Sequence, residues 1–404
     1  MREEGESFVK RNDLKIAVFG AGGAVGSILA SFLQQIEDVS QIICLDCNLE
    51  RMFSFLKNRK KIIHVLTAEG TNEKLIRRLK DCFLIINAAS SLLNKRIMKI
   101  ALELGSNYLD FASFDNDNQA EQKSFHKRFK EKKIAGWINW GIGPGLTNLL
   151  VAKLIDGLTD CVVRIRVAED TKLAKQANGQ EPLIFLWNPQ LLIDEITSPV
   201  YPFSKDPRRA RIIREPFSGP EFCVFPYPIG KITCRHMNEN ETITLKNMPD
   251  IREADVKTGG DDLERLFKIL PKIKKRIKKG QIQEYLKNIK TPSPNEIKKM
   301  IQKGIILDGR VAILVEVDGQ NPETEERIFK KATWMGLGLR EVSHGTTHIN
   351  FNTALVALCA IRQIINSSGP DPGVWAPEEI SKTDREAILD CIQKKSNPVH
   401  FQTL

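Results

Sequence analysis

The stretch KIAVFGAGGAVGSILASFL, residues 15–33, decides the fold of this 404-residue chain. It reads as a short apolar strand, a glycine-rich turn and an apolar helix. Glycines let backbone amides approach a pyrophosphate closely, and the N-terminus of a helix favours its negative charge. Gly20 and Gly22 begin a GxGxxG pattern whose third position is Val25, whereas Gly20, Gly23 and Gly26 satisfy the variant GxxGxxG. The stretch therefore predicts a dinucleotide-binding turn formed by Gly20, Gly22, Gly23, Ala24, Val25 and Gly26, with a purely structural tight turn as the alternative.

The same alternation of strand and helix continues along the first 150 residues. Further strands are predicted at 41–46, 61–66, 83–88, 108–112 and 135–141. Helical patterns lie near 24–36, 48–59, 71–80, 94–104 and 117–132. Strands alternating with helices are typical of βαβ units in a parallel sheet. The sequence thus predicts an α/β fold with a doubly wound Rossmann domain over residues 1–150.

Asp46 ends the second predicted strand, where an acidic side chain can accept hydrogen bonds from the ribose hydroxyls of an adenosine. An acid at this position repels a 2'-phosphate, so it predicts NAD. Arg51 lies close enough in sequence to leave NADP open. A solvated Asp at a strand end is the structural alternative.

Small and polar residues follow the later strands, at the sheet edge where ligands bind in open α/β folds. Asn87 and Ala88 follow the fourth strand, Asp110 lies in the fifth, and GIGPGLTN, residues 141–148, follows the sixth. We expect Asn87, Ala88 and Gly143 to contact the cofactor. Thr147 and Asn148 have the alternative of capping the next helix.

After Asp160 the pattern changes to prolines, turns and short β-rich runs, which predicts a mixed or antiparallel sheet in a second α+β domain over residues 151–345. The predicted strands are 161–169, 221–228, 231–236, 241–245 and 310–319. Two helical patterns near 261–303 follow. The remaining residues, 346–404, form a C-terminal segment with a strongly apolar helix at 352–366 and a turn segment, GPDPGVWAPEE.

The formal net charge of +10 is concentrated in one part of the second domain. Between Lys268 and Lys303 there are twelve basic and two acidic residues, which accounts for the whole excess. A solvated helical face explains such a run better than nucleic-acid or membrane binding, because Tyr285 is almost the only aromatic residue among the charges. We expect no specific nucleic acid and no membrane, and a cytoplasmic location.

Metal binding is not predicted. Cys44 and Cys47 form a CxxC, but no second pair stands at metal spacing, and the eight cysteines are expected to be reduced. His344 and His348 are four residues apart without an acidic neighbour to complete a site.

The quoted motifs resemble those of saccharopine dehydrogenases and lysine 6-dehydrogenases. The resemblance rests on FGAGGAVG, INAAS at 86–90, YLD at 108–110 and GIGPGLTN. It continues in LWNPQLLIDEITSP at 186–199, PIGKITCRHMNENETITL at 228–245 and GVWAPEE at 373–379. It implies a Rossmann domain, a catalytic and dimerisation domain, C-terminal helices that pack on the first domain, and a homodimer. Such enzymes move a hydride between a nicotinamide cofactor and a carbon-nitrogen bond of an amino acid.

This chemistry requires a base, because the ammonium group of an amine must lose a proton before hydride leaves its carbon. The candidates are Asp110, Glu239, Glu241 and His236. An arginine fork suits the carboxylate of an amino acid. Arg235 is preferred for this clamp and Arg214 is a further candidate, among the arginines at 208, 209, 211, 214 and 235. Some relatives carry a His where this chain has Glu239.

Three other functions fit parts of the sequence. A catalytically inactive nucleotide sensor would keep the glycine turn, and a basic-helix module would use the lysines to bind nucleic acid or a membrane surface. A semialdehyde dehydrogenase requires a cysteine nucleophile, and the chain has no cysteine between Cys82 and Cys161. The sequence favours an NAD(P)-dependent amino-acid dehydrogenase over all three.

Overall fold

A computed structural model describes most of the chain. The described residues are 13–48, 50, 60–66, 72–113, 115–116, 119–175, 184, 186, 189–210, 213–287, 292–342, 345–367 and 369–403. They divide into two compact units. The first contains residues up to 114, 121–140 and 354–392, and the second contains 115–120, 141–353 and 393–404. The predicted helix at 48–59, Arg51, Arg211 and His344 lie wholly or largely outside the described residues.

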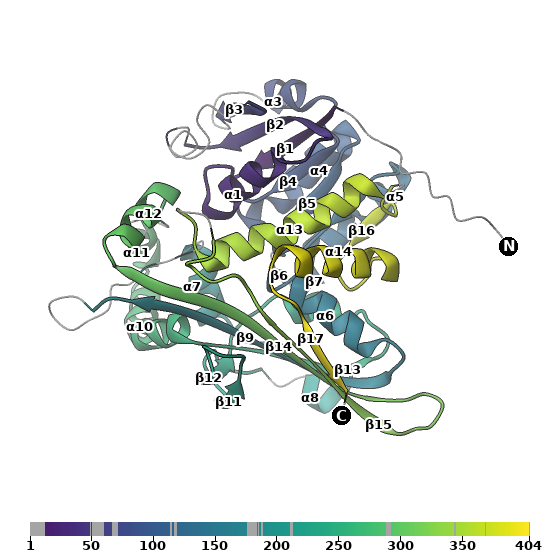
Figure 1. Ribbon diagram of the computed structural model, residues 1–404, viewed down its shortest axis with the longest axis vertical. Helices are drawn as coiled ribbons and strands as arrows, with labels where there is room; N and C mark the ends of the chain where they lie inside the picture. The colour runs from purple at the N-terminus through teal and green to yellow at the C-terminus, as the bar shows by residue number, and fades with distance from the viewer. Residues whose placement is uncertain are drawn as a thin grey trace. The chain divides into compact units, whose positions relative to one another are not determined.

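The first unit is built on a parallel sheet of seven strands in the order β16-β8-β5-β4-β1-β2-β3 (Figure 1). The strands are β1 (Leu14–Phe19), β2 (Val39–Asp46), β3 (Ile62–Leu66), β4 (Leu84–Asn87), β5 (Asn107–Asp110), β8 (Ala135–Trp137) and β16 (Gly373–Trp375). Chain order reverses at β1, which is the doubly wound arrangement that the sequence predicts. The α/β fold class is confirmed.

Short helices connect these strands, namely α1 (Ala24–Leu33), α3 (Asn72–Leu79), α4 (Asn94–Leu104) and α5 (His126–Glu131). The C-terminal helices α13 (His348–Asn366) and α14 (Lys382–Lys395) contribute most of their length to this unit. The predicted turn GPDPGVWAPEE contains a seventh strand instead, because β16 pairs with β8 from Gly373 to Trp375. His126 holds this strand by accepting the Val374 N–H at 3.2 Å.

Among the described residues, α13 is long and apolar enough to cross a membrane. However, 78% of its apolar window is buried inside the protein, as in the core helix of a globular domain. Packing inside the protein therefore explains the length and the apolar composition of α13.

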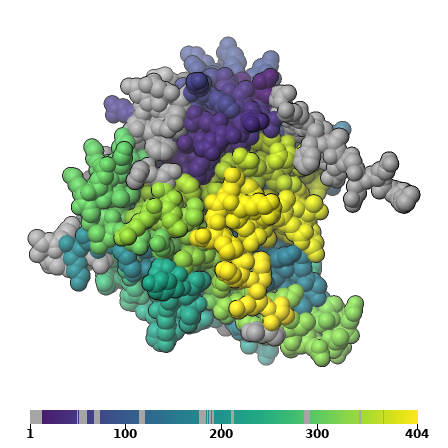
Figure 2. Space-filling view, in the orientation of Figure 1, coloured from purple at the N-terminus to yellow at the C-terminus, as the bar shows by residue number. Residues whose placement is uncertain are grey.

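The second unit is built on a mixed sheet in which β9 and β14 run side by side for fifteen residues each (Figure 1). Its order is β11-β12-β13-β9-β14-β15-β17, with β10 paired to β13. The strands are β9 (Thr159–Leu173), β10 (Phe203–Ser204), β11 (Glu221–Val224), β12 (Lys231–His236), β13 (Ile251–Gly259), β14 (Ile306–Gln320), β15 (Arg327–Met335) and β17 (His400–Thr403); a separate hairpin joins β6 (Asp115–Asn116) and β7 (Gln119–Ala120). The turn between β14 and β15 is exposed at the surface (Figure 2).

The helices of this unit correct two predictions. They are α6 (Leu146–Ile155), α7 (Pro189–Thr197), α8 (Pro207–Ala210), α9 (Glu241–Leu245), α10 (Asp261–Lys278), α11 (Ile282–Lys287) and α12 (Pro294–Gln302). ETITL at 241–245 is helix α9 and not a strand, because Asn148 of α6 donates to the Glu241 carbonyl at 3.3 Å and to Thr244 Oγ1 at 3.4 Å. Tertiary contacts here override the strand preference of Thr and Ile.

The Lys-rich segment forms three helices where two patterns are predicted. Along α10, Leu263, Leu266, Leu270 and Ile273 are buried in a cluster with apolar residues of α7. The lysines of α10 project from the other side and are exposed. This is the amphipathic pattern of a surface helix.

Candidate functional site

The glycine turn of the first unit has room only for backbone. A Cβ on Gly20 would lie 2.7 Å from backbone atoms of Ala88 and Ala89, and a Cβ on Gly26 would lie 2.2 Å from the Gly20 carbonyl oxygen. Gly20 also has a φ of +78°, which glycine adopts most readily. The turn leads directly into α1, whose first residues, Ala24 and Val25, leave their amide groups without partners inside the helix. The structure therefore brings the predicted pyrophosphate contacts together in one turn at the N-terminus of α1.

Asp46 lies beside this turn. Its Oδ2 accepts the Gly22 N–H at 2.8 Å and its Oδ1 accepts the Asn48 N–H at 3.0 Å. The carboxylate is thus oriented at the end of β2, next to the glycines, where the adenosine ribose lies in Rossmann domains.

Asn87 and Ala88 form the next turn, after β4. The Asn87 side chain donates to the Ser90 carbonyl at 3.0 Å and to Asn94 Oδ1 at 2.7 Å, while its Oδ1 accepts the Ala89 N–H at 3.1 Å. These bonds fix the backbone that packs against Gly20. Asn87 therefore shapes the cofactor turn through its neighbours.

Asp110 lies at the end of β5, 1% exposed, in a network of polar side chains. Its carboxylate accepts the Asn139 N–H at 2.8 Å, the Tyr108 hydroxyl at 2.9 Å and the Gln122 amide at 3.0 Å. Burial raises the pKa of Asp110 to about 7, although these three hydrogen bonds act to lower it. Because all three donors come from the chain, the geometry favours a positioning role for Asp110 over proton transfer.

In the second unit, the loop at 141–148 meets helix α9. A Cβ on Gly143 would lie 2.7 Å from Glu241 Oε1, and Thr147 Oγ1 lies 3.4 Å from the same oxygen. The structure thus brings together Gly143 and Glu241, predicted as a cofactor contact and a catalytic group. Glu241 is 1% exposed.

Glu241 belongs to a cluster of four carboxyl groups, which we call the glutamate cluster: Glu169, Glu195, Glu239 and Glu241. Burial raises the pKa of Glu169 well above its ordinary value, and the charges of Asp262, Glu239 and Glu241 raise it further. Burial also raises the pKa of Glu195 well above its ordinary value, and the charges of Glu239, Glu169 and Glu241 raise it further. Burial also raises the pKa of Glu239, although Thr258 Oγ1 donates to it at 2.9 Å. These carboxyl groups are close enough to resist simultaneous ionisation.

The predicted set identifies two members of this cluster as candidate bases, Glu239 and Glu241, and misses two. Glu169 lies within a predicted strand. The sequence signal that could have identified it is an acidic residue at an inward-facing position of that strand. Glu195 lies in the apolar stretch LLIDEIT of α7. No spacing in the sequence shows that these residues meet.

Arg235 and His236 point to opposite faces of β12, since side chains alternate along a strand. Arg235 lies opposite Thr258 of β13 in the strand register, and the Thr258 hydroxyl donates to Glu239. The Arg235 guanidinium also lies 3.7 Å from the Glu264 carboxylate. His236 pairs with Lys257 and lies on the other face, where Arg214 also lines a cavity. The structure therefore separates Arg235 from His236 and Arg214, and their predicted roles remain predictions.

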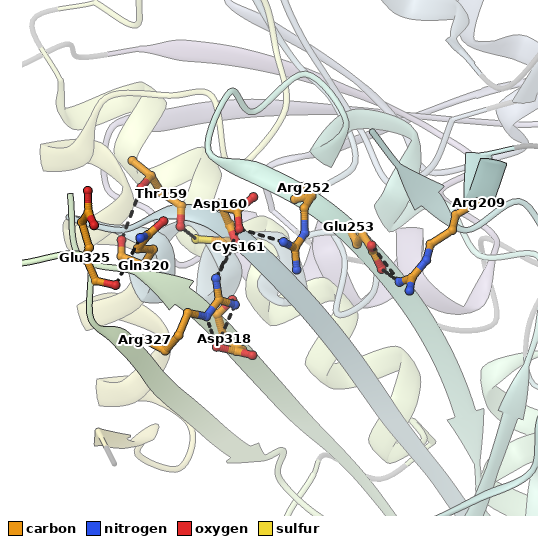
Figure 3. Close-up of polar contacts among 10 residues, drawn as sticks. All are labelled: Thr159, Asp160, Cys161, Arg209, Arg252, Glu253, Asp318, Gln320, Glu325 and Arg327. Carbon is orange, nitrogen blue, oxygen red and sulfur yellow. Dashed lines mark hydrogen bonds and ion pairs between the residues drawn. The ribbon is translucent and has the colours of Figure 1, made fainter. Parts of the chain in front are cut away.

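Figure 3 shows ion pairs that fix this sheet away from the glutamate cluster. Asp160 Oδ2 accepts from Arg252 at 2.8 Å and from Arg327 at 3.3 Å, and Arg327 also pairs with Asp318 at 2.8 Å. These groups are about 40% exposed, so such pairs contribute modestly to stability.

No metal site is present among the described residues, where no group of three or more His, Cys, Asp or Glu side chains is arranged to hold an ion. None of the eight cysteines forms a disulfide. Burial of Cys44 raises the pKa of its thiol to about 12, and burial lowers the pKa of His348 to about 3.

Residues 16–136 match the family model described as the saccharopine dehydrogenase NADP binding domain. This part of the chain is therefore similar to the NADP-binding domain of saccharopine dehydrogenases. The match spans the glycine turn, Asp46, Asn87 and Asp110, and it supports a nicotinamide dinucleotide as the cofactor. The comparison with curated protein sequences finds no match.

Solved structures extend this likeness beyond the NADP-binding domain. Apo saccharopine dehydrogenase (L-Glu forming) from Saccharomyces cerevisiae matches with a TM-score of 0.65 and 11% identity, over 97% of this chain and 100% of that chain. The chain has this fold throughout. A meso-DAP dehydrogenase mutant from Clostridium tetani E88 (TM-score 0.41, 14% identity, 92% and 96% coverage) and C. glutamicum DAP dehydrogenase (0.42, 9%, 93% and 96%) are more distant.

The geometry of the NADP-binding domain generates a first prediction. Gly26→Ala should weaken dinucleotide binding at least about tenfold, because the added Cβ collides with the Gly20 carbonyl and must displace the turn. Gly105→Ala is the control, since a Cβ on Gly105 meets nothing within 4 Å, although Gly105 has a positive φ. Gly105→Ala should lower the free energy of unfolding by about 1 kcal/mol and leave the dinucleotide affinity unchanged. Fluorescence titration with NADH and NADPH measures both. Wild-type affinity in Gly26→Ala would contradict the assignment.

A second prediction concerns Asp110. Between about pH 4 and 7 the folded protein retains this proton while the unfolded chain releases it, so rising pH destabilises the folded state. The difference in unfolding free energy between wild type and Asp110→Asn should change by up to about 4 kcal/mol over this range, to the disadvantage of wild type. Urea denaturation at several pH values measures it, with the exposed Asp371→Asn as control. A pH-independent difference would show that Asp110 ionises normally.

Proposed function

We propose that this chain is an NAD(P)-dependent oxidoreductase that acts on a carbon-nitrogen bond of an amino acid, converting an amine to an imine or semialdehyde, or the reverse. The main support for this proposal is the glutamate cluster. Carboxyl groups whose pKa values are raised by one another are suited to bind a cationic amine, because the cation offsets their repulsion.

The same cluster supplies the base. The substrate ammonium group must lose one proton before its carbon can give up a hydride. Glu241 is the preferred acceptor, since it is the most deeply buried of the four and lies against Gly143 and Thr147. When bound, the nicotinamide cofactor accepts the hydride. Water addition to the resulting iminium and loss of ammonia then give an aldehyde.

Arg235 is proposed to bind the carboxylate of the amino acid. It shares a face of the sheet with Thr258, whose hydroxyl donates to Glu239. Its guanidinium lies 4.8 Å from the Phe267 ring centroid and 3.7 Å from the Glu264 carboxylate. These two neighbours orient the guanidinium plane without forming a close bidentate ion pair with it. A planar fork in this setting suits a carboxylate ligand.

NAD is the proposed cofactor. The Asp46 carboxylate, fixed by the Gly22 and Asn48 amides, would repel the 2'-phosphate of NADP. The name of the matching family, NADP binding domain, keeps NADP as the alternative. The ratio of KM values for the two cofactors decides between them.

Steady-state assays with NAD and NADP and a panel of basic amino acids, with lysine and saccharopine first, test the proposal. We expect amine-dependent reduction of the cofactor. The contradicting result is a protein that binds the cofactor but oxidises no amine and, in the reverse direction, does not aminate an aldehyde in the presence of an amine donor. That result would favour the nucleotide-sensor alternative.

Glu241→Gln should lower kcat by about 10²- to 10⁴-fold at neutral pH, because the amide cannot accept the proton. Dinucleotide affinity should not change, since the glycine turn is intact. Glu316→Gln is the matched control, because Glu316 pairs with Arg164 in the β14-β9 register and projects from the other face of the sheet. A Glu241→Gln variant with wild-type kcat would exclude Glu241 as the base.

Glu195→Gln tests the coupling within the cluster. Removing one negative charge lowers the pKa of the remaining carboxyl groups. The acidic limb of the kcat/KM profile should therefore move to lower pH. A limb that stays in place or moves to higher pH would show that Glu195 does not interact with the catalytic base.

A further inference from the structure

The second unit contains a cavity of about 380 Å³ that the proposed reaction does not use. It is lined by residues of β9 and β13, together with Pro202, Phe203, Ser204, Arg209, Arg214 and Gly219. The bidentate pair of Arg209 with Glu253, at 2.9 Å for each oxygen, lies at its edge (Figure 3). The volume falls within the range of small-molecule sites.

Strand register places this cavity on the opposite face of the sheet from the glutamate cluster. Arg164 pairs with Asp255, and Arg166 pairs with Lys257, so these four side chains project from one face. Thr258, one residue further along β13, projects from the other face and contacts Glu239. The arginines of the cavity therefore lie on the other face of the sheet from Thr258, although Pro202 and His236 line both the cavity and a small pocket that Glu239 also lines.

The carboxylates that line the cavity are already paired. Arg166, 2% exposed, donates to Glu221 at 3.1 and 3.2 Å and lies 3.2 Å from Asp255. Lys257 also pairs with Glu221. Burial opposes ionisation of Glu221, but Arg166 and Lys257 lower its pKa to about 2. With Glu253 held by Arg209, all three carboxylates are neutralised by three cations.

Two arginines remain in excess. Arg164 and Arg214 line the cavity, both are exposed, and neither has an ion pair within the part of the chain that the structure describes. Glu316, which lies opposite Arg164 on β14, instead lies 3.9 Å from Lys331. His236 adds no positive charge at neutral pH, because burial, together with Lys257 and Arg214, lowers its pKa to about 4. The cavity thus carries a net charge of about +2, from five basic and three acidic side chains.

We propose that this cavity binds a small dianion, carrying either a phosphate group or two carboxylates, through the Arg164 and Arg214 guanidinium groups. Both groups form planar forks that match the oxygens of such anions. The buried Arg166 is held by Glu221 and Asp255, and the exposed Arg209 is held by Glu253. This site is independent of the proposed dehydrogenase activity.

Calorimetric titration of the full chain with inorganic phosphate and with glutarate tests the proposal. We expect one site per chain, weakened about tenfold or more by Arg164→Gln or Arg214→Gln. The tighter of the two probes identifies the ligand as a phosphate or a dicarboxylate. Arg208→Gln is the control of equal charge change, because Arg208 is 91% exposed on α8 and does not line the cavity.

Gly26→Ala separates this site from the anion-binding glycine turn, and it should leave the binding of both probes unchanged. Protection of Arg164 and Arg214 in the wild-type protein from phenylglyoxal, mapped by peptide mass, gives a second readout that needs no variant. Absence of binding at millimolar concentration, an equal loss in Arg208→Gln, a loss in Gly26→Ala alone, or no protection of either arginine would each overturn the proposal.

Discussion

Repulsion among four glutamates in the second unit is the constraint on which the proposed chemistry depends. Glu241 is almost fully buried, and the pKa values of Glu169, Glu195 and Glu239 are raised because burial and neighbouring carboxylates both disfavour charge. Such an arrangement costs folding free energy in the free protein. A bound cation would offset that cost, which is why we propose that the cluster binds an amine. The same raised pKa values bring a carboxylate toward the range in which it exchanges protons at neutral pH.

The first unit is governed by a different constraint, the close approach of backbone to backbone. Gly20 and Gly26 leave no room for a Cβ, and the turn after β4 packs directly on Gly20. Asp110, Tyr108, Asn94 and Asn87 form a chain of hydrogen bonds behind that turn. The polar network therefore positions the turn that is predicted to contact the cofactor, and the geometry favours a positioning role for Asp110.

Local patterns predict most of the first unit. The glycine turn, Asp46 and the alternation of strands and helices follow from rules that act over a few residues, and the parallel sheet confirms them. The seventh strand, β16, could not be found this way, because its three residues become a strand only by pairing with β8. ETITL shows the same limit, since contacts from α6 make it a helix despite its strand-forming residues.

The second unit was harder to predict because its site is assembled from distant segments. Glu169, Glu195, Glu239 and Glu241 come from β9, α7, a loop and α9, and no sequence spacing relates them. Neighbouring residues separate as well, since strand alternation sends Arg235 and His236 to opposite faces of β12. The face of His236 carries the arginine-rich cavity and the face of Arg235 carries the glutamate cluster, so a single strand divides two sites of opposite charge.

The most direct test of this account is a carbon-13 NMR titration of the glutamate carboxyl groups, with cluster members assigned by single Gln substitutions. The account predicts that Glu169, Glu195 and Glu239 titrate well above the ordinary value of about 4.3, and that a saturating basic amino acid with cofactor lowers their pKa values. Ordinary pKa values for all three, unchanged by any amine, would contradict the claim that the cluster is an amine-binding site.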